Sequence, residues 1–400
     1  MLLEDIAQVN AQYLQRLCDD KCPESETLDF KRDLPGNSDK DKHELLKDIC
    51  ALANASGGDL VYCVDEIDGA AASIVPAFAE PADNAKRRIS QVLDAGLEPR
   101  VPGVRLHHVE IQGGYALVVR VPASYEGPHC LRSNNNRRFV IRNGTGTTDM
   151  NYEQIRSAFD RTATLAEKAR QFVAKRNDLI GQRKTPTPMA QGPIWALHLV
   201  PLAGVAERQT VDLREVHSRA FHDFIGPDWS SASRTFNFDG LAVHPGGAPD
   251  DGHYTYNHIF RTGAMEAVHI GGVQRQIDKG GPERSIVWSL DMSKFFYWSA
   301  SKFIQSAKSW GFGGPALLGI AILDVQGYEL AIGEAFHRFS KATADRPHLI
   351  PPEVWIDNLD TVSIDDALRP SLDVLWQAFG LERCLDFDAK SGVYSPRPGQ

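Results

Sequence analysis

The sequence has few cysteines, no long apolar run and no excess of positive charge. Six cysteines in 400 residues are too few for a fold held together by disulfides, so we expect reduced thiols and a cytoplasmic protein. No apolar stretch approaches the roughly 20 residues that a membrane-spanning helix needs. Glu4 and Asp5 stand where a secretory signal would carry basic residues. We therefore expect neither export nor a membrane partner.

Several other signals are missing. The chain has 43 Lys and Arg against 52 Asp and Glu, a net charge of −9, which disfavours a general nucleic-acid coat but leaves room for a local basic patch. It lacks the GxxxxGK[ST] phosphate loop, and Gly57-Gly58 follows a helical pattern, so nucleotide hydrolysis is disfavoured. Cys18 and Cys22 have no Cys/His pair close after them, so we expect no zinc.

The composition and the order of apolar, helical and linker segments predict a two-domain globular protein. Hydrophobic residues make up 42% and charged residues 24%, as in soluble domains. Short apolar runs alternate with helical patterns, which indicates an α/β fold of the mixed α+β kind. The predicted segments are a helical extension at 1–22, a first domain at 23–160, a connecting helix and Pro/Lys/Thr-rich linker at 161–190, a second α+β domain at 191–388 and a loosely ordered tail at 389–400.

A strand–helix–strand pattern in the first domain gathers charged residues. Side chains alternate along a strand, so Asp29 and Lys31 share one face. An amphipathic helix follows, which Gly57 ends in a left-handed cap, and the apolar run at 60–64 predicts a buried central strand. Asp65 emerges at its carboxyl end, where α/β sheets tend to bind ligands. The pattern thus brings Asp29, Lys31 and Asp65 within reach of one another.

An order of short motifs extends these residues from Pro23 to Phe159. It consists of Glu24, DFK at 29–31, a helix containing ALAN at 51–54, Gly57-Gly58, VDE at 64–66, and then YALVVRVPAS, GPHCLR and RRFVIRNGTGTTDM. This order resembles the Schlafen AlbA_2 domain, which is also described as a divergent AAA or DNA-binding domain. The resemblance covers a little over a third of the chain. Beyond Arg161 the sequence resembles no named family comparably.

The resemblance implies a catalytic site. In Schlafen-type nucleases an acidic triad binds a divalent metal, and the enzyme cuts RNA, notably tRNA. By position the triad here is Glu24, Asp29 and Asp65, with Lys31 beside it. Mg²⁺ or Mn²⁺ is the implied cofactor, because these hard cations prefer carboxylate oxygens and would polarise the phosphoryl group. The family's nucleases usually carry Glu at position 29, so Asp29 draws the carboxylate back by about one carbon–carbon bond.

The implied function is a metal-dependent endoribonuclease acting in antiphage defence or stress response, with RNA, especially tRNA, preferred over DNA. Two alternatives remain open. One is a non-catalytic DNA-binding transcriptional regulator, in which the acids are structural, and the other is an ATP-binding switch protein. In the family two lobes build a clamp, and this chain has one copy, so we expect a homodimer.

Basic residues suggest where nucleic acid binds. The segment LRSNNNRRFVIRNG predicts a hairpin with its turn at 134–136, between the run through Leu131 and a strand at 138–142. Arginine forms forked pairs with phosphate oxygens. The predicted contacts are Arg132, Arg137, Arg138 and Arg142. Arg87 and Arg88 form a second candidate cluster, although a solvated helix face explains them more simply.

The second half has strand patterns and no catalytic signature. The strand-like runs are IWALHLVPL, FNFDGLAV, HYTYNHIF, AMEAVHIG, SIVWSL and ALLGIAILDV. A helix is predicted over 293–310 with Asp291 or Ser293 as N-cap, and a second helix over SLDVLWQAFGL. Glu266 is a lone acid near Arg261, to which we assign no chemistry.

Overall fold

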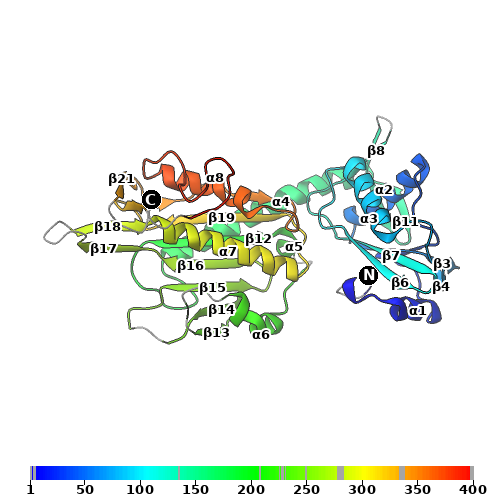
Figure 1. Ribbon diagram of the computed structural model, residues 1–400, viewed down its shortest axis with the longest axis horizontal. Coiled ribbons are helices and arrows are strands. Elements are labelled where there is room, and N and C mark those ends of the chain that lie inside the picture. Colours follow the sequence, from blue (N-terminus) through cyan, green and yellow to red (C-terminus); the bar gives the residue numbers. More distant parts are fainter. Residues whose placement is uncertain are drawn as a thin grey trace. The chain divides into compact units, whose positions relative to one another are not determined.

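The computed structural model describes residues 2, 6–133, 136–206, 209–224, 226, 229, 231–247, 250–276, 283–332 and 338–396. The chain forms two compact units, Met1–Thr164 and Leu165–Gln400 (Figure 1). Each unit contains both helices and sheets, so the predicted mixed α and β fold is confirmed. No described helix is both long enough and apolar enough to cross a membrane.

The main sheet of the first unit has four strands. Its order is β1 (Leu28–Lys31), β2 (Gly58–Tyr62), β7 (Gly114–Val121) and β6 (Arg105–Ile111). β1 and β2 are parallel and are joined by α2 (Asp39–Asn54), whereas the other neighbours are antiparallel. The predicted strand–helix–strand unit is therefore confirmed. β2 is buried along its whole length, as a central strand requires.

The glycine pair after α2 allows a close approach of three backbone segments. Gly57 has φ 72°, and a Cβ there would lie 2.6 Å from the Ala123 nitrogen. A Cβ on Gly58 would lie 2.6 Å from the Thr27 oxygen. Only glycine meets both requirements, since real Cβ atoms do not come so close to backbone.

Helices and small sheets complete the first unit. The helices are η1 (Ile6–Gln8), α1 (Ala11–Asp19) and α3 (Ala82–Gly96). The small sheets are β3 (Val64–Ile67) with β4 (Ala70–Ile74), β5 (Leu97–Glu98) with β8 (Cys130–Ser133) and β9 (Asn136–Arg138), and β10 (Val140–Asn143) with β11 (Gly146–Asp149). The predicted hairpin is formed by β8 and β9, although 134 and 135 lie outside the described residues. The single strand expected at 138–142 is instead divided between β9 and β10.

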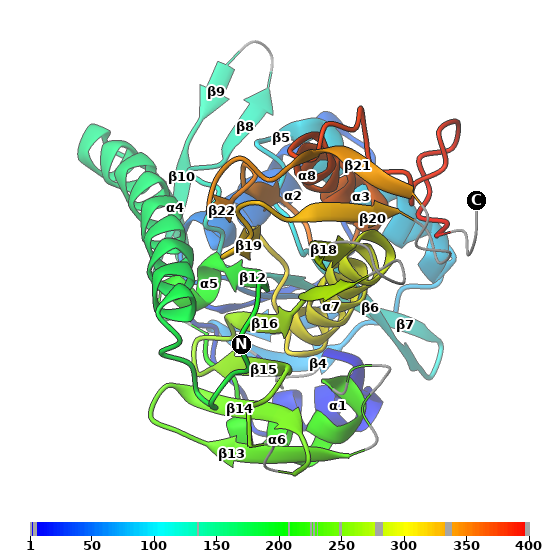
Figure 2. The same ribbon diagram turned by 90° about the vertical axis from the view of Figure 1, so that its left-hand side faces the viewer.

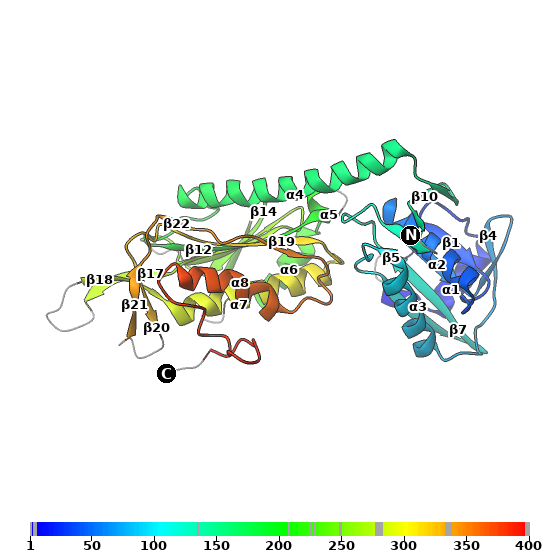
Figure 3. The ribbon, with the colours of Figure 1, turned by 90° about the horizontal axis from the view of Figure 1, so that it is seen from above.

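The connecting helix, which was expected within 161–190, begins nine residues before that range. α4 (Tyr152–Gly181) is one continuous helix of 30 residues, and the boundary between the two units falls within it (Figure 3). Its start is fixed by a reciprocal cap: the Asn151 N–H donates to Gln154 Oε1, and the Gln154 N–H donates to Asn151 Oδ1, both at 2.9 Å. No proline or glycine interrupts the helix before Gly181, so nothing in the sequence ends it sooner.

The second unit is built on a large antiparallel sheet. Its strands, in spatial order, are β13 (Ala232–Phe236), β14 (Gly240–Pro245), β15 (Thr255–Phe260), β16 (Met265–Ile270), β12 (Ile194–Pro201), β19 (Ala316–Leu323) and β22 (His348–Leu349), with β23 (Val354–Ile356) also paired to β19. The run FNFDGLAV, predicted as one strand, contains the turn between β13 and β14. There Asn237 Oδ1 accepts the Gly240 N–H at 2.7 Å.

A smaller sheet and four helices surround this core. The sheet orders β17 (Gly272–Gln276), β18 (Glu283–Trp288), β20 (Glu329–Ile332) and β21 (Arg338–Thr343), and the helices are α5 (Leu202–Val205), α6 (Leu213–Asp223), α7 (Ser289–Ser309) and α8 (Ile364–Gln377). α7 starts four residues before the predicted position. The buried side chains of Leu290 and Met292 extend its apolar stripe toward the N-terminus.

The C-terminal tail was expected to be loosely ordered, and its described part is held in place. The Tyr394 ring stacks on Tyr297 with centroids 4.1 Å apart, and the Tyr394 N–H donates to Asp365 Oδ1 at 2.9 Å. An aromatic residue with a partner anchors a polar, Pro-rich segment that composition alone classes as loose.

Candidate functional site

A buried ion-pair network surrounds Asp29 on β1. One carboxylate oxygen lies 2.8 Å from Arg142 Nη2, and the other lies 2.5 Å from Lys31 Nζ. The side chains of Asp29 and Arg142 are 4% and 2% exposed, whereas that of Lys31 is 37% exposed. Asp29 and Lys31 share a face as predicted. Asp29 is therefore a buried counter-ion between an arginine in the core and a half-exposed lysine.

Two further acids border this network. Lys31 Nζ lies 3.6 Å from Asp48 Oδ2. Burial would lower the pKa of Lys31, but the carboxylates of Asp48 and Asp29 outweigh it, so the pKa is raised. Burial raises the pKa of Asp48. Glu24 Oε1 accepts the Phe30 N–H at 2.8 Å, and burial raises its pKa, with the Asp29 charge acting in the same direction. Acids with raised pKa values beside a lysine form a polar, partly open cluster.

Asp65 is paired elsewhere. Its carboxylate lies 2.8 Å from Arg32 Nη1. The structure thus brings Glu24, Asp29 and Lys31 together and holds Asp65 in a separate, exposed ion pair. Within the described parts of the chain, no three His, Cys, Asp or Glu side chains are grouped so that they could hold a metal ion.

The predicted triad does not fit a divalent cation in this arrangement. Both oxygens of Asp29 face cationic nitrogens, one oxygen of Glu24 accepts a backbone N–H, and Asp65 is bound to Arg32. A cation there would have to replace Lys31 or Arg142 as the partner of Asp29. We therefore derive no catalytic step through a metal. Sequence reasoning missed Asp48, which a helical apolar pattern gives no reason to single out.

The β8–β9 hairpin carries three exposed arginines. It projects from the rest of the first unit (Figure 2). Arg132 and Arg137 are cross-strand partners, so their side chains share one face. Their side chains are 60% and 63% exposed, and both approach Glu98 Oε2, at 3.9 and 2.9 Å. Arg138 faces the other side and pairs with Asp149 at 2.8 Å. Exposed pairs of this kind are weak, so a phosphate can displace the carboxylates.

The other predicted arginines are placed differently. Arg142 was expected on the surface, but it is buried and also donates to the Ser25 carbonyl at 3.3 Å, so it is a structural residue here. Arg88 pairs with Glu80 at 2.7 Å and donates to the Pro35 carbonyl at 2.7 Å. Arg87 is exposed on α3. The hairpin arginines and Arg87 are therefore the accessible members of the predicted set.

A buried network in the second unit has no counterpart in the predictions. Glu266 on β16 receives two hydrogen bonds from Arg176 on α4, at 2.7 and 2.9 Å, and one from the Tyr256 hydroxyl at 2.7 Å. His198 Nε2 lies 3.1 Å from the same carboxylate. Burial opposes ionisation of Glu266, but His198 and Arg176 hold its pKa well below the usual range. The fully satisfied carboxylate attaches α4 to the sheet.

Comparisons with known proteins concern the first unit. No curated protein matches the chain. The N-terminal domain of a RecG-related protein from Nitrosomonas europaea is 18% identical, covering 36% of this chain and 93% of its own, with a TM-score of 0.27. The DIP2311 protein from Corynebacterium diphtheriae is 16% identical, covering 31% of this chain and 25% of its own, with a TM-score of 0.23. Residues 24–151 match the family model described as Schlafen, AlbA_2, so the first unit contains the AlbA_2 domain that the order of motifs predicted.

Proposed function

We propose that the first unit binds nucleic acid, RNA in preference to DNA, through the β8–β9 hairpin. The observation that carries the proposal is the pairing of Arg132 with Arg137 on one exposed face of a projecting hairpin. Each guanidinium presents a fork that matches two phosphate oxygens. Release of counterions from the phosphates drives such binding, which makes it strongly dependent on salt. The AlbA_2 match supports the same function.

Metal-dependent cleavage of RNA, in antiphage defence or stress response, is the competing function. Glu24, Asp29 and Lys31 favour it, because they gather at the partly open end of β1. The pairing of both Asp29 oxygens with cations disfavours it. A DNA-binding regulator would use the same hairpin. The ATP-binding switch has less support, since close backbone packing already explains Gly57 and Gly58.

The binding test compares the full-length protein with the double variant Arg132→Ala/Arg137→Ala on labelled tRNA and duplex DNA. We expect at least a tenfold loss of affinity and a log–log salt slope smaller by about 2. Arg156→Ala is the control, because Arg156 lies on α4 in an exposed pair with Asp160. Unchanged affinity in the double variant would contradict the proposal.

The same preparations separate binding from cleavage. Incubation of tRNA with wild-type protein and Mn²⁺ or Mg²⁺ should leave the tRNA intact. Metal-dependent fragments that Asp65→Ala abolishes would instead establish the nuclease.

A further inference from the structure

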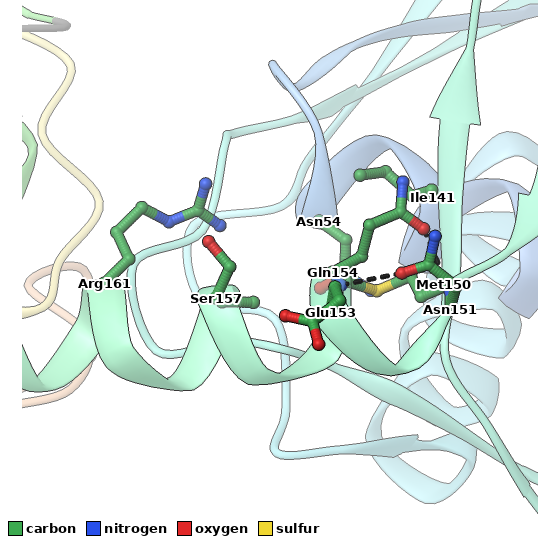
Figure 4. Close-up of a pocket in the computed structure, with 9 residues that line it drawn as sticks. Asn54, Ile141, Met150, Asn151, Glu153, Gln154, Ser157 and Arg161 are labelled. Atoms are coloured by element: carbon green, nitrogen blue, oxygen red, sulfur yellow. Dashed lines mark hydrogen bonds between the residues drawn. The ribbon is translucent and has the colours of Figure 1, made fainter.

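A pocket of about 320 Å³ opens at the start of α4 (Figure 4). Its inner lining, the floor, comprises the apolar side chains of Ile141 of β10, Met150 and Ala158, together with the buried amide of Asn54. Met150 and Ala158 are 9% and 5% exposed. The α4 side chains of Gln154, Ser157 and Arg161 form a polar rim, and Figure 4 shows Ser157 and Arg161 on the same side of the helix. A largely apolar floor with a few polar groups is the usual construction of a small-molecule site.

The rim holds hydrogen-bonding groups in fixed positions. The reciprocal cap engages the amide oxygens of Asn151 and Gln154, which orients both side chains (Figure 4). The cap uses only the amide oxygens of the two side chains, so their amide NH₂ groups can donate hydrogen bonds to a ligand. Glu153 also lines the pocket and supplies an acceptor. Donors and an acceptor around an apolar surface complement the edge and the face of a nucleobase.

The backbone connects the pocket to the arginine hairpin. The floor residue Met150 directly follows Asp149, the ion-pair partner of Arg138 on β9. The Met150 N–H donates to the Phe139 carbonyl at 2.8 Å, which ties the floor to the segment that follows β9. The Phe159 ring is 55% exposed and contacts Phe139 edge to face, with centroids 6.4 Å apart. An exposed aromatic ring can serve as a stacking platform for an unpaired base.

We infer that this pocket takes one unpaired base of a single-stranded nucleic acid whose phosphates contact the β8–β9 hairpin. The inference rests on the proposed function and adds the class of substrate. A base within a duplex is stacked and paired, so it cannot present its face to the floor and its edge to the rim without leaving the helix. Single strands are therefore bound more tightly than duplexes of the same sequence.

The test measures binding of the full-length protein to a labelled single-stranded 12-mer, as RNA and as DNA, and to the matching blunt duplexes. Ser157→Phe fills the pocket from an exposed helix position. Gln154→Glu keeps the helix cap and removes the amide donor. The control Thr164→Phe adds the same bulk at an exposed α4 position outside the pocket. The RNA and DNA arms show which strand supplies the base.

We expect Ser157→Phe to weaken single-strand binding about tenfold, Gln154→Glu to weaken it less, and duplex binding to be unchanged in both. Equal wild-type affinity for single strands and duplexes, or no effect of Ser157→Phe, would overturn the inference.

If Arg132→Ala/Arg137→Ala then still loses binding, the hairpin proposal stands alone. If only the pocket variants lose binding, the hairpin proposal fails and the pocket stands. Wild-type protein that binds neither form would refute both.

Discussion

Arg142 shows why a residue type alone does not locate a contact. In the sequence it lies in a basic cluster, and its neighbours Val140 and Ile141 are equally apolar, so the pattern does not say which face of the strand is buried. In the structure Val140 and Arg142 face inward, and Asp29 supplies the charge that makes burial of the guanidinium tolerable. Because side chains alternate along a strand, the sequence predicted that Asp29 and Lys31 lie on the same face. The pairing of Asp29 with Arg142 was not predictable, because the two residues lie 113 positions apart in the chain.

Removing the buried charge should therefore be costly. We expect Arg142→Met to lower the free energy of unfolding by about 3–5 kcal/mol, because it leaves the Asp29 carboxylate buried beside Lys31 alone. Urea denaturation measures the change. Arg138→Ala breaks an exposed pair with Asp149 and should cost less than about 1 kcal/mol. Equal effects of the two substitutions would show that Arg142 is not the counter-ion of Asp29.

His258 on β15 gives the second unit a pH dependence. Burial lowers its pKa to about 4 from 6.5, with Glu266 opposing and Arg176 reinforcing the shift. Between these two pH values the unfolded chain binds a proton that the folded chain does not, so stability falls as the pH is lowered from 6.5 toward 4. The contribution lost is up to about 3 kcal/mol.

Thermal unfolding of wild type and His258→Gln at pH 7 and pH 5 tests this expectation. The wild type should lose more stability between the two pH values than the variant does. Parallel losses would assign the acid sensitivity to other groups.

At the scale of elements, the sequence pattern predicted those helices and strands whose formation depends on interactions between nearby residues. The apolar run of β2, the amphipathic α2 and its glycine end follow from side-chain periodicity and backbone conformation. The hairpin of β8 and β9 was also predictable from its turn residues, but the division of the following segment between β9, β10 and β11 was not, because strands of three to four residues carry little periodicity. The early start of α4 depends on the paired cap of Asn151 and Gln154. An N-x-x-Q signal was present in the sequence and would have located it.

The junction of α2 and β2 allows a matched comparison of two glycines. Gly57 and Gly69 both have φ 72°, but only a Cβ on Gly57 meets backbone, at 2.6 Å, whereas a Cβ on Gly69 meets nothing within 4 Å. Gly57→Ala should cost about 2 kcal/mol or more beyond the loss from Gly69→Ala, which is about 1 kcal/mol of backbone strain. Chemical denaturation of both variants checks the difference. Similar losses would mean that the segment after β7 moves aside.

At the scale of the whole molecule, the family resemblance predicted one unit and left the other undefined. The strands of the second unit were mostly recognisable, but their order was not. β12 lies between β16 and β19, which come much later in the chain, and such pairings depend on the complete core rather than on local sequence. The burial of Glu266 under Arg176 is equally non-local.

The homodimer stays a prediction at this scale. The resemblance implies a clamp of two lobes, and the family model matches this chain at residues 24–151. We expect light scattering at micromolar concentration to give a mass of about twice the 44.2 kDa of the chain. A mass of one chain would exclude a dimer formed in the absence of nucleic acid.

Glu98 has a consequence for selectivity that its weak ion pairs do not suggest. One carboxylate contacts both Arg132 and Arg137, so it occupies the position where a phosphate would lie and keeps the two guanidinium groups converged. An incoming anion must compete with this internal mimic. A lone phosphate gains little over the carboxylate, whereas a chain of phosphates releases many counterions at once. We expect Glu98 to make the hairpin select nucleic-acid polymers over small phosphorylated metabolites.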